Sequence, residues 1–166
     1  MDPEAIMYGY REELNVNIKY VKSSGSVIPI TFILKKFFEI PNVFMKTIDY
    51  LTKLQSEKSI SNIMQTEFWK SKTSGSKEIT LPLLLYEDDF ECGNPLGSHT
   101  TLYKMSGMCI SLPCLPPEFR SRLDTVFLVQ IVHSSDVQEY KDELIYGHVI
   151  KQLNSLATEG IRINAG

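Results

Sequence analysis

Leu81–His99 has the sequence LPLLLYEDDFECGNPLGSH. Its apolar run, Leu83–Tyr86, has the length of a strand and lies between turn-forming residues, which predicts a buried strand. Four carboxylates follow this run within five residues: Glu87, Asp88, Asp89 and Glu91. Like charges at this spacing repel one another, and burial would raise the free energy of their charged forms further. We therefore expect either water or a bound cation to relieve the repulsion, and the function of the chain depends on which.

The composition is that of an ordinary globular chain, with 166 residues, 43% hydrophobic and 22% charged. This length predicts one domain, or one domain with a small extension. A net charge of −3 excludes a chain that binds nucleic acid through its overall charge, although 17 Lys and Arg residues could form a local patch. No apolar run approaches the roughly 20 residues of a membrane helix, and the acidic N-terminus is unlike a secretory signal. We expect a nuclear or cytoplasmic protein with no membrane partner.

The three cysteines are Cys92, Cys109 and Cys114. Their spacing matches neither a CxxC motif nor a zinc-binding pattern. An odd number of cysteines in a reducing compartment favours free thiols.

Residues 1–77 are predicted to form a hairpin followed by helices. Residues 1–15 could form one or two helical turns, and the alternation in Val16–Val21 indicates a strand. Ser23–Ser26 is predicted to be a turn, and Val27–Ile30 could return as the second strand of the hairpin.

Three helices are then expected, each with apolar residues at the spacing of one helix face: Thr31–Ile40, Pro41–Leu54, and Ile60–Lys72 with Ser59 as its cap. Their aromatic side chains could provide a surface on which nucleic-acid bases stack, but helical spacing favours a role in the core. A Ser, Gly and Lys-rich linker around Lys72 and Lys77 ends this region.

Residues 78–166 are predicted to form a second region with the order β-β-β-α-β. The expected strands are Glu78–Asp88, Thr101–Leu112 and Thr125–Val132, and a short helix should begin at Pro116 or Pro117. The long amphipathic helix Asp142–Gly160 precedes a strand that starts at Ile161. Three consecutive strands form an antiparallel meander, and the helix then returns the chain to the sheet. The fold class is therefore α/β (α+β), with an incomplete ribonuclease-H-like sheet.

Two segments together carry a resemblance to a known family. They are LPLLLYEDDFECGNPLGSH and LYKMSGMCISLPCLPPEFRSRLDTVFLVQIVHSSD, which contain an acidic strand, an Asn-Pro turn and a Leu-Pro-Pro element. These segments resemble the central domain of transposase-like proteins encoded by DNA transposons of animal genomes, and are distantly similar to CACTA-type transposases. The resemblance covers roughly residues 27 to 163.

The resemblance implies a DDE-type DNA strand-transfer domain of ribonuclease-H-like fold, with DNA as its partner. In such enzymes three carboxylates hold two Mg²⁺ or Mn²⁺ ions, which activate the nucleophile and stabilise the leaving oxygen. The first family aspartate falls on Asp88, as catalytic residue and metal ligand, with Asp89 the next candidate. Because side chains alternate along a strand, only one of the two can face the site.

The remaining carboxylates of a DDE centre have no match in this chain. Asp136 and Glu159 do not occupy the corresponding positions, and the chain ends where the next strand should begin. No dedicated DNA-binding motif is visible. We therefore expect a fragment or truncated copy that is catalytically inactive, with its acidic cluster hydrated. The alternative is a domesticated, non-catalytic interaction module that forms a homodimer or binds a protein through an exposed sheet edge.

Two other constellations are disfavoured. His133, Ser134 and Asp136 lie too close in sequence to give the geometry of a catalytic triad. Arg120 and Arg122 could contact phosphate, but a solvated helix end explains them better.

Overall fold

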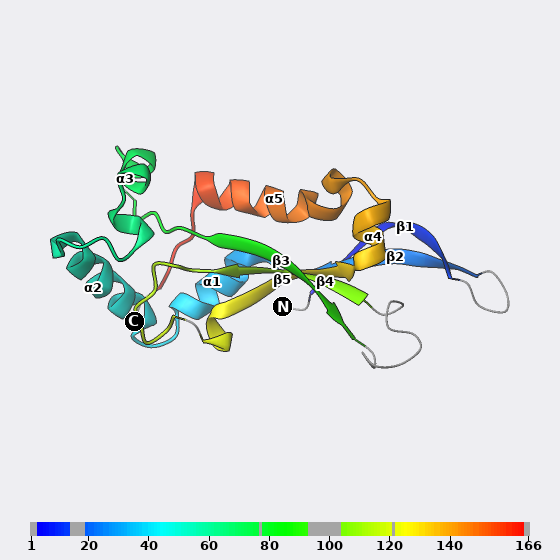
Figure 1. Ribbon diagram of the computed structural model, residues 1–166, viewed down its shortest axis with the longest axis horizontal. Coiled ribbons are helices and arrows are strands. Elements are labelled where there is room, and N and C mark those ends of the chain that lie inside the picture. Colours follow the sequence, from blue (N-terminus) through cyan, green and yellow to red (C-terminus); the bar gives the residue numbers. More distant parts are fainter. Residues whose placement is uncertain (1–2, 14–18, 77, 93–103, 121, 165–166) are drawn as a thin grey trace. The chain divides into compact units, whose positions relative to one another are not determined.

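Five strands form one antiparallel sheet in the described part of this computed structural model, which comprises residues 3–13, 19–76, 78–92, 104–120 and 122–164 (Figure 1). The strands are β1 (Glu4–Glu13), β2 (Lys19–Val27), β3 (Leu84–Glu91), β4 (Lys104–Ser111) and β5 (Val126–His133). Their order across the sheet is β1-β2-β5-β4-β3. The predicted α+β class is confirmed, and β5 is the central strand that its apolar sequence indicated.

Helices separate the hairpin from the other strands and follow the last strand. They are α1 (Ile30–Phe38), α2 (Val43–Ser56), α3 (Glu67–Thr73), α4 (Ser134–Glu139) and α5 (Asp142–Glu159), with the 3₁₀ turns η1 (Ile63–Gln65) and η2 (Leu123–Thr125). α5 ends at Gly160, whose positive φ of 67° and N–H bond to the Leu156 carbonyl are the predicted C-terminal stop. None of the helices in the described ranges combines the length and apolar character needed to cross a membrane.

The ribonuclease-H-like topology is not confirmed. The β3-β4-β5 meander is present, but residues 160–164 form no strand, so the strand expected from Ile161 is wrong. The sheet is extended instead at β5, where β2 pairs antiparallel with Ser26 opposite Ile131 and Val27 opposite Gln130. A short apolar segment after a helix forms a strand only if a partner strand is within reach. Sequence periodicity does not show whether such a partner exists.

The chain divides into two compact units: residues 1–33, 86–109 and 128–161, and residues 34–85, 110–127 and 162–166. The expected boundary between residues 77 and 78 does not separate them, since each unit contains residues from both sides of it.

The N-terminal hairpin exists, but its strands differ from the prediction. Residues 4–13 form β1 and not helical turns, and Ser23–Ser26, the predicted turn, lies inside β2. Ser23 is fully buried and its hydroxyl donates to the Asp136 carboxylate at 3.3 Å. Small residues, which usually indicate a turn, are therefore used here to let neighbouring side chains approach the strand.

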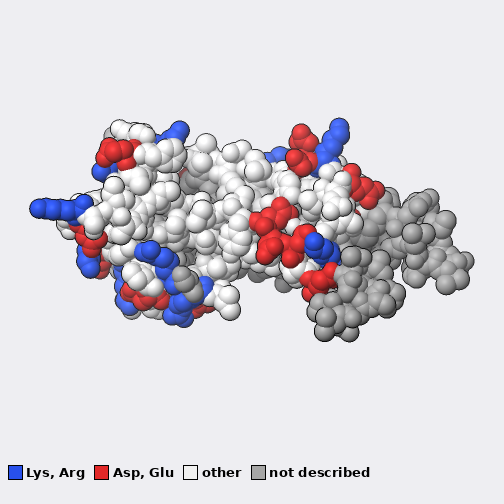
Figure 2. All heavy atoms as spheres, viewed as in Figure 1, with Lys and Arg blue, Asp and Glu red and all other residues white. Residues whose placement is uncertain are grey.

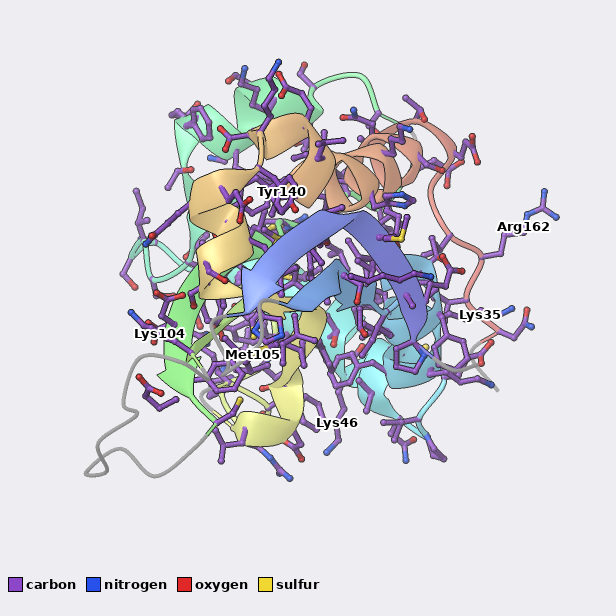
Figure 3. The ribbon with its side chains drawn as sticks, turned by 90° about the vertical axis from the view of Figure 1, so that its right-hand side faces the viewer. Lys35, Lys46, Lys104, Met105, Tyr140 and Arg162 are labelled. Carbon is purple, nitrogen blue, oxygen red and sulfur yellow. The ribbon has the colours of Figure 1, made fainter. Side chains whose placement is uncertain are left out.

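Gly25 shows how close that approach is. A Cβ atom at this position would lie 2.5 Å from Val132 Cγ1, 2.7 Å from the Tyr8 hydroxyl and 2.9 Å from the Ile131 carbonyl oxygen. Tyr8 and Val132 form a buried cluster with Ile145 of α5. Tyr140, which is labelled in Figure 3, packs against this cluster with its ring 6.4 Å from that of Tyr8.

The second unit is built around aromatic contacts. Phe37 packs edge-on against Phe38 at 5.3 Å and against Phe127 at 5.1 Å, and Phe38 packs against Phe44 at 5.9 Å. These contacts support the core interpretation of the α1 and α2 aromatics.

The predicted helix Ile60–Lys72 is broken into η1 and α3. Asn62 caps η1 by accepting the Met64 N–H, and Thr66 begins α3 by accepting the Trp69 N–H. Because Asn62 and Thr66 each cap a helix start, the chain forms two short helices here in place of one. As a consequence, the face expected to be buried is largely exposed, with Ile60 at 71% and Phe68 at 62%.

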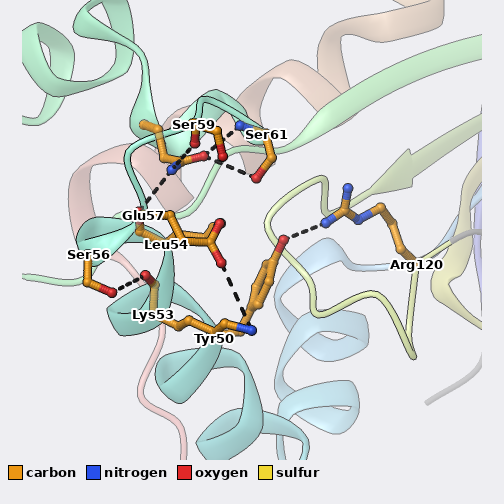
Figure 4. A network of polar contacts seen from close by, with 9 residues as sticks. Tyr50, Lys53, Leu54, Ser56, Glu57, Ser59, Ser61 and Arg120 are labelled. Carbon is orange, nitrogen blue, oxygen red and sulfur yellow. Dashed lines mark hydrogen bonds and ion pairs between the residues drawn. The ribbon is translucent and has the colours of Figure 1, made fainter.

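A polar network holds this part of the second unit together (Figure 4). The Gln65 amide donates to the carbonyls of Leu54 and Ser59, both at 2.9 Å. Arg120 donates to the Tyr50 hydroxyl at 2.7 Å and lies over its ring. Arg120 therefore contacts α2, and the short helix expected at Pro116 or Pro117 is a single turn closed by the Phe119 N–H and the Pro116 carbonyl.

We predict that Gly25→Ala lowers the free energy of unfolding by about 1–3 kcal/mol, because the new methyl group overpacks against Val132 and Tyr8. Gly147→Ala is the matched control. Gly147 lies in α5 with nothing within 4 Å of the added Cβ, so its substitution should stabilise the helix by about 1 kcal/mol. Urea denaturation of both variants measures the difference. Equal stability of the two variants would contradict the packing described for β2.

Candidate functional site

β3 is an edge strand, and its side chains are exposed along almost its whole length. Leu84 is 54% exposed, Leu85 39% and Tyr86 43%. The predicted burial of the run Leu83–Tyr86 is therefore wrong. An apolar run is buried on both faces only in the middle of a covered sheet, and among the described strands β3 pairs with β4 alone.

Two of the four β3 carboxylates point to the side of the sheet where α4 and α5 begin. Glu87 accepts hydrogen bonds from the hydroxyls of Ser106 and Tyr146, the latter at 2.8 Å. Asp89 accepts one from the Ser134 hydroxyl at 2.9 Å and forms an ion pair with the Lys104 ammonium at 2.8 Å. The two residues share this side because side chains alternate along a strand.

Asp88, the predicted catalytic residue and metal ligand, has different surroundings. Its carboxylate accepts the N–H of Asp89 at 2.9 Å, and the residue is exposed. Asp88 also lies at the rim of a shallow hollow of about 380 Å³, lined in addition by Glu87, Asp89, Ser106, Ser134, Val137 and Gln138. Of the two candidate aspartates, Asp89 is thus the one that contacts other side chains.

The charges of this cluster are coupled. The Lys104 and Ser134 hydrogen bonds lower the pKa of Asp89, and the Asp89 carboxylate, followed by those of Glu91 and Asp88, raises the pKa of Lys104. Burial, with the hydrogen bond to Glu87 as second cause, raises the pKa of Tyr146 to about 12. Tyr146 therefore remains a hydrogen-bond donor to Glu87 throughout the physiological pH range.

The transposase resemblance implies an Mg²⁺ or Mn²⁺ centre at these carboxylates. Hard divalent cations need several converging oxygen ligands. In the described ranges, no group of three or more His, Cys, Asp or Glu residues is placed to hold a metal ion. The Lys104 ammonium lies 2.8 Å from the Asp89 carboxylate and offsets part of its negative charge. Among the described residues, Asp88 and Asp89 are therefore not joined by a third acidic, His or Cys side chain placed to complete a metal site.

The site draws on four residues that the sequence interpretation missed: Lys104, Ser106, Ser134 and Tyr146. An opposite-charge pair between adjacent strands is a recognised signal, and it could have suggested Lys104 once β3 and β4 were paired. Ser134 and Tyr146 come from α4 and α5, and no motif links them to the acidic run.

Two members of the disfavoured triad bond to residues outside it. Ser134 donates to Asp89, and the fully buried Asp136 accepts from Ser23. Arg122 forms an ion pair with Asp124 at 2.6 Å. Cys92, Cys109 and Cys114 are free thiols, as predicted. The GNPLGS element and His99 lie outside the described residues.

Comparisons with protein-family models, with curated protein sequences and with solved structures find no match for this chain. The transposase resemblance therefore depends on the quoted motifs alone.

We predict that Lys104→Gln raises the pKa of Asp89, because the substitution removes the cation that favours the carboxylate. The lowered pKa means that Asp89 stabilises the fold above its unfolded pKa of about 3.9, and that this contribution is lost as the pH falls through the folded value. The variant should accordingly lose less stability on acidification. Carboxyl NMR titration reports the pKa. Lys53→Gln, which removes a lysine paired with Glu57, is the control and should leave the Asp89 titration unchanged.

Proposed function

We propose that this chain is a transposon-derived, transposase-like protein without nuclease activity of its own. The resemblance of the acidic strand and the Leu-Pro-Pro segment to DDE transposases supports the first part. The second part depends on one observation: the Asp89 carboxylate is held by the Lys104 ammonium and the Ser134 hydroxyl. A nuclear location and a DNA-binding ancestor belong to the same proposal.

The chemistry of strand transfer explains why that observation matters. Metal ions in a DDE centre neutralise the phosphate and generate the nucleophile, and they need carboxylates with free oxygen lone pairs. A lysine ammonium can neutralise Asp89 but cannot activate water as a Lewis acid. Without a metal, the exposed carboxylates of β3 would also repel the DNA backbone.

We predict that the purified chain does not nick supercoiled plasmid in Mg²⁺ or Mn²⁺ at a rate above that of Asp88→Ala and Asp89→Ala. Agarose-gel conversion of supercoiled to open-circular DNA measures the rate. Because a contaminating nuclease would act equally in all three preparations, only a loss of nicking in the variants would refute the proposal.

The second candidate function is a non-catalytic interaction module that uses the open edge of the sheet. It is favoured by the position of β3 at the end of the strand order and by the exposure of its side chains. Edge strands present unpaired main-chain groups that can pair with another polypeptide.

We predict that the free protein is a monomer in light scattering and that alternate amides of β3 exchange rapidly with solvent. The reason is that the outer N–H groups of an edge strand have no partner strand, while four carboxylates oppose pairing of two copies. A dimer that protects the β3 amides would show instead that a second copy occupies the edge.

A further inference from the structure

We propose that the outer edge of β3 binds a basic, extended peptide segment as an added antiparallel or parallel strand. The proposal rests on the interaction-module candidate and assigns the chemistry of its partner.

The backbone of β3 is open to pairing along the outer side of the strand. β3 is last in the strand order, and within the described ranges no strand pairs with its outer side. Every second residue of an edge strand directs its N–H and C=O groups outward, and these groups form hydrogen bonds with an added strand. β3 is 8 residues long, which is enough for several such bonds.

The edge formed by β3 carries an excess of negative charge. β3 contributes Glu87, Asp88, Asp89 and Glu91, and the nearby basic residue Lys104 is bound to Asp89. Figure 2 shows acidic side chains gathered over this strand with a basic group beside them. The excess negative charge attracts Lys and Arg. The same negative charge opposes binding of a nucleic-acid backbone. It also opposes pairing with a second copy of β3, because the carboxylates of the two strands would face one another.

Side chains of different character alternate along β3. Glu87, Asp89 and Glu91 occupy one set of positions along β3, and Tyr86, Asp88 and Phe90 belong to the other. The Phe90 ring lies over Gly107 of β4, where an added Cβ would be 3.0 Å from Cε1, and it remains 43% exposed. A strand with basic residues on one side and apolar residues on the other would complement both faces of the edge.

The experiment uses the full chain and synthetic peptides of the same eight-residue length as β3. The probe alternates lysine and valine, and its counterpart alternates glutamate and valine. A third peptide carries N-methyl groups on alternate backbone nitrogens of the lysine probe. Fluorescence polarisation measures affinity, and hydrogen exchange locates the protected amides.

The test variant is Asp88→Asn with Glu91→Gln, which removes two carboxylates, keeps an oxygen at position 88 that can accept the Asp89 N–H, and leaves the side-chain partners of Glu87 and Asp89 in place. Asp49→Asn with Glu78→Gln is the matched control, since it changes the net charge equally at exposed positions outside β3. Circular dichroism checks that both variants fold.

We expect the lysine peptide to bind, to protect β3 amides and to bind roughly tenfold more weakly to the β3 variant than to the control. Higher salt should weaken binding, because the charges are exposed. N-methylation should abolish it. If the glutamate peptide bound equally well and also protected the β3 amides, the preference for a basic partner would be refuted. The role of the β3 edge as an interaction module would not be. Absence of β3 protection with every peptide would refute both.

Discussion

The side-chain amide of Gln130 connects the parts of the first unit. Gln130 lies on the central strand β5 and is 2% exposed. Its nitrogen donates to the Tyr8 hydroxyl at 3.1 Å and to the Ile145 carbonyl at 2.6 Å, so one buried group contacts β1 and α5 at once. A buried amide is costly unless it is hydrogen-bonded, and these two bonds require the hairpin and the helix to be in place together.

The hairpin can meet this requirement only because β2 carries small residues at the positions where other side chains approach it. Gly25 leaves room for Tyr8 and Val132, and the Ser23 hydroxyl reaches Asp136 in α4. The helix α5 contributes a further bond, since the Gln152 side chain accepts the N–H of Ile30 at 2.6 Å where α1 begins. The hairpin thus pairs with one side of β5 through β2, and the acidic strand β3 forms the opposite edge of the sheet.

This arrangement determines the chemistry of β3. Four carboxylates on a central strand would need a metal ion or would protonate, but on an edge strand they are hydrated and need only partial compensation. Lys104, Ser106, Ser134 and Tyr146 supply that compensation to Glu87 and Asp89. The remaining negative charge faces solvent at a strand whose main-chain groups can still pair. The acidic cluster therefore lies on an exposed edge strand, where Glu87 and Asp89 are compensated by neighbouring side chains.

Local patterns in the sequence were sufficient for the α+β class, the helices α1, α2 and α5, the stop at Gly160, and the strands β4 and β5, because helical and strand periodicity are properties of neighbouring residues. They also located the acidic cluster. The positions of Ser23 and Gly25 inside a strand, and the split of η1 from α3, could not be predicted. In each case a small or polar residue has two local uses, and contacts with distant residues select between them.

The sequence by itself determined that four carboxylates follow an apolar run and must be neutralised or hydrated. Only the tertiary structure decided that hydration and Lys104 achieve this, because strand order depends on which distant segments pair. The pairing of β2 with β5 made β3 an edge, and that single choice exposed both its carboxylates and its backbone.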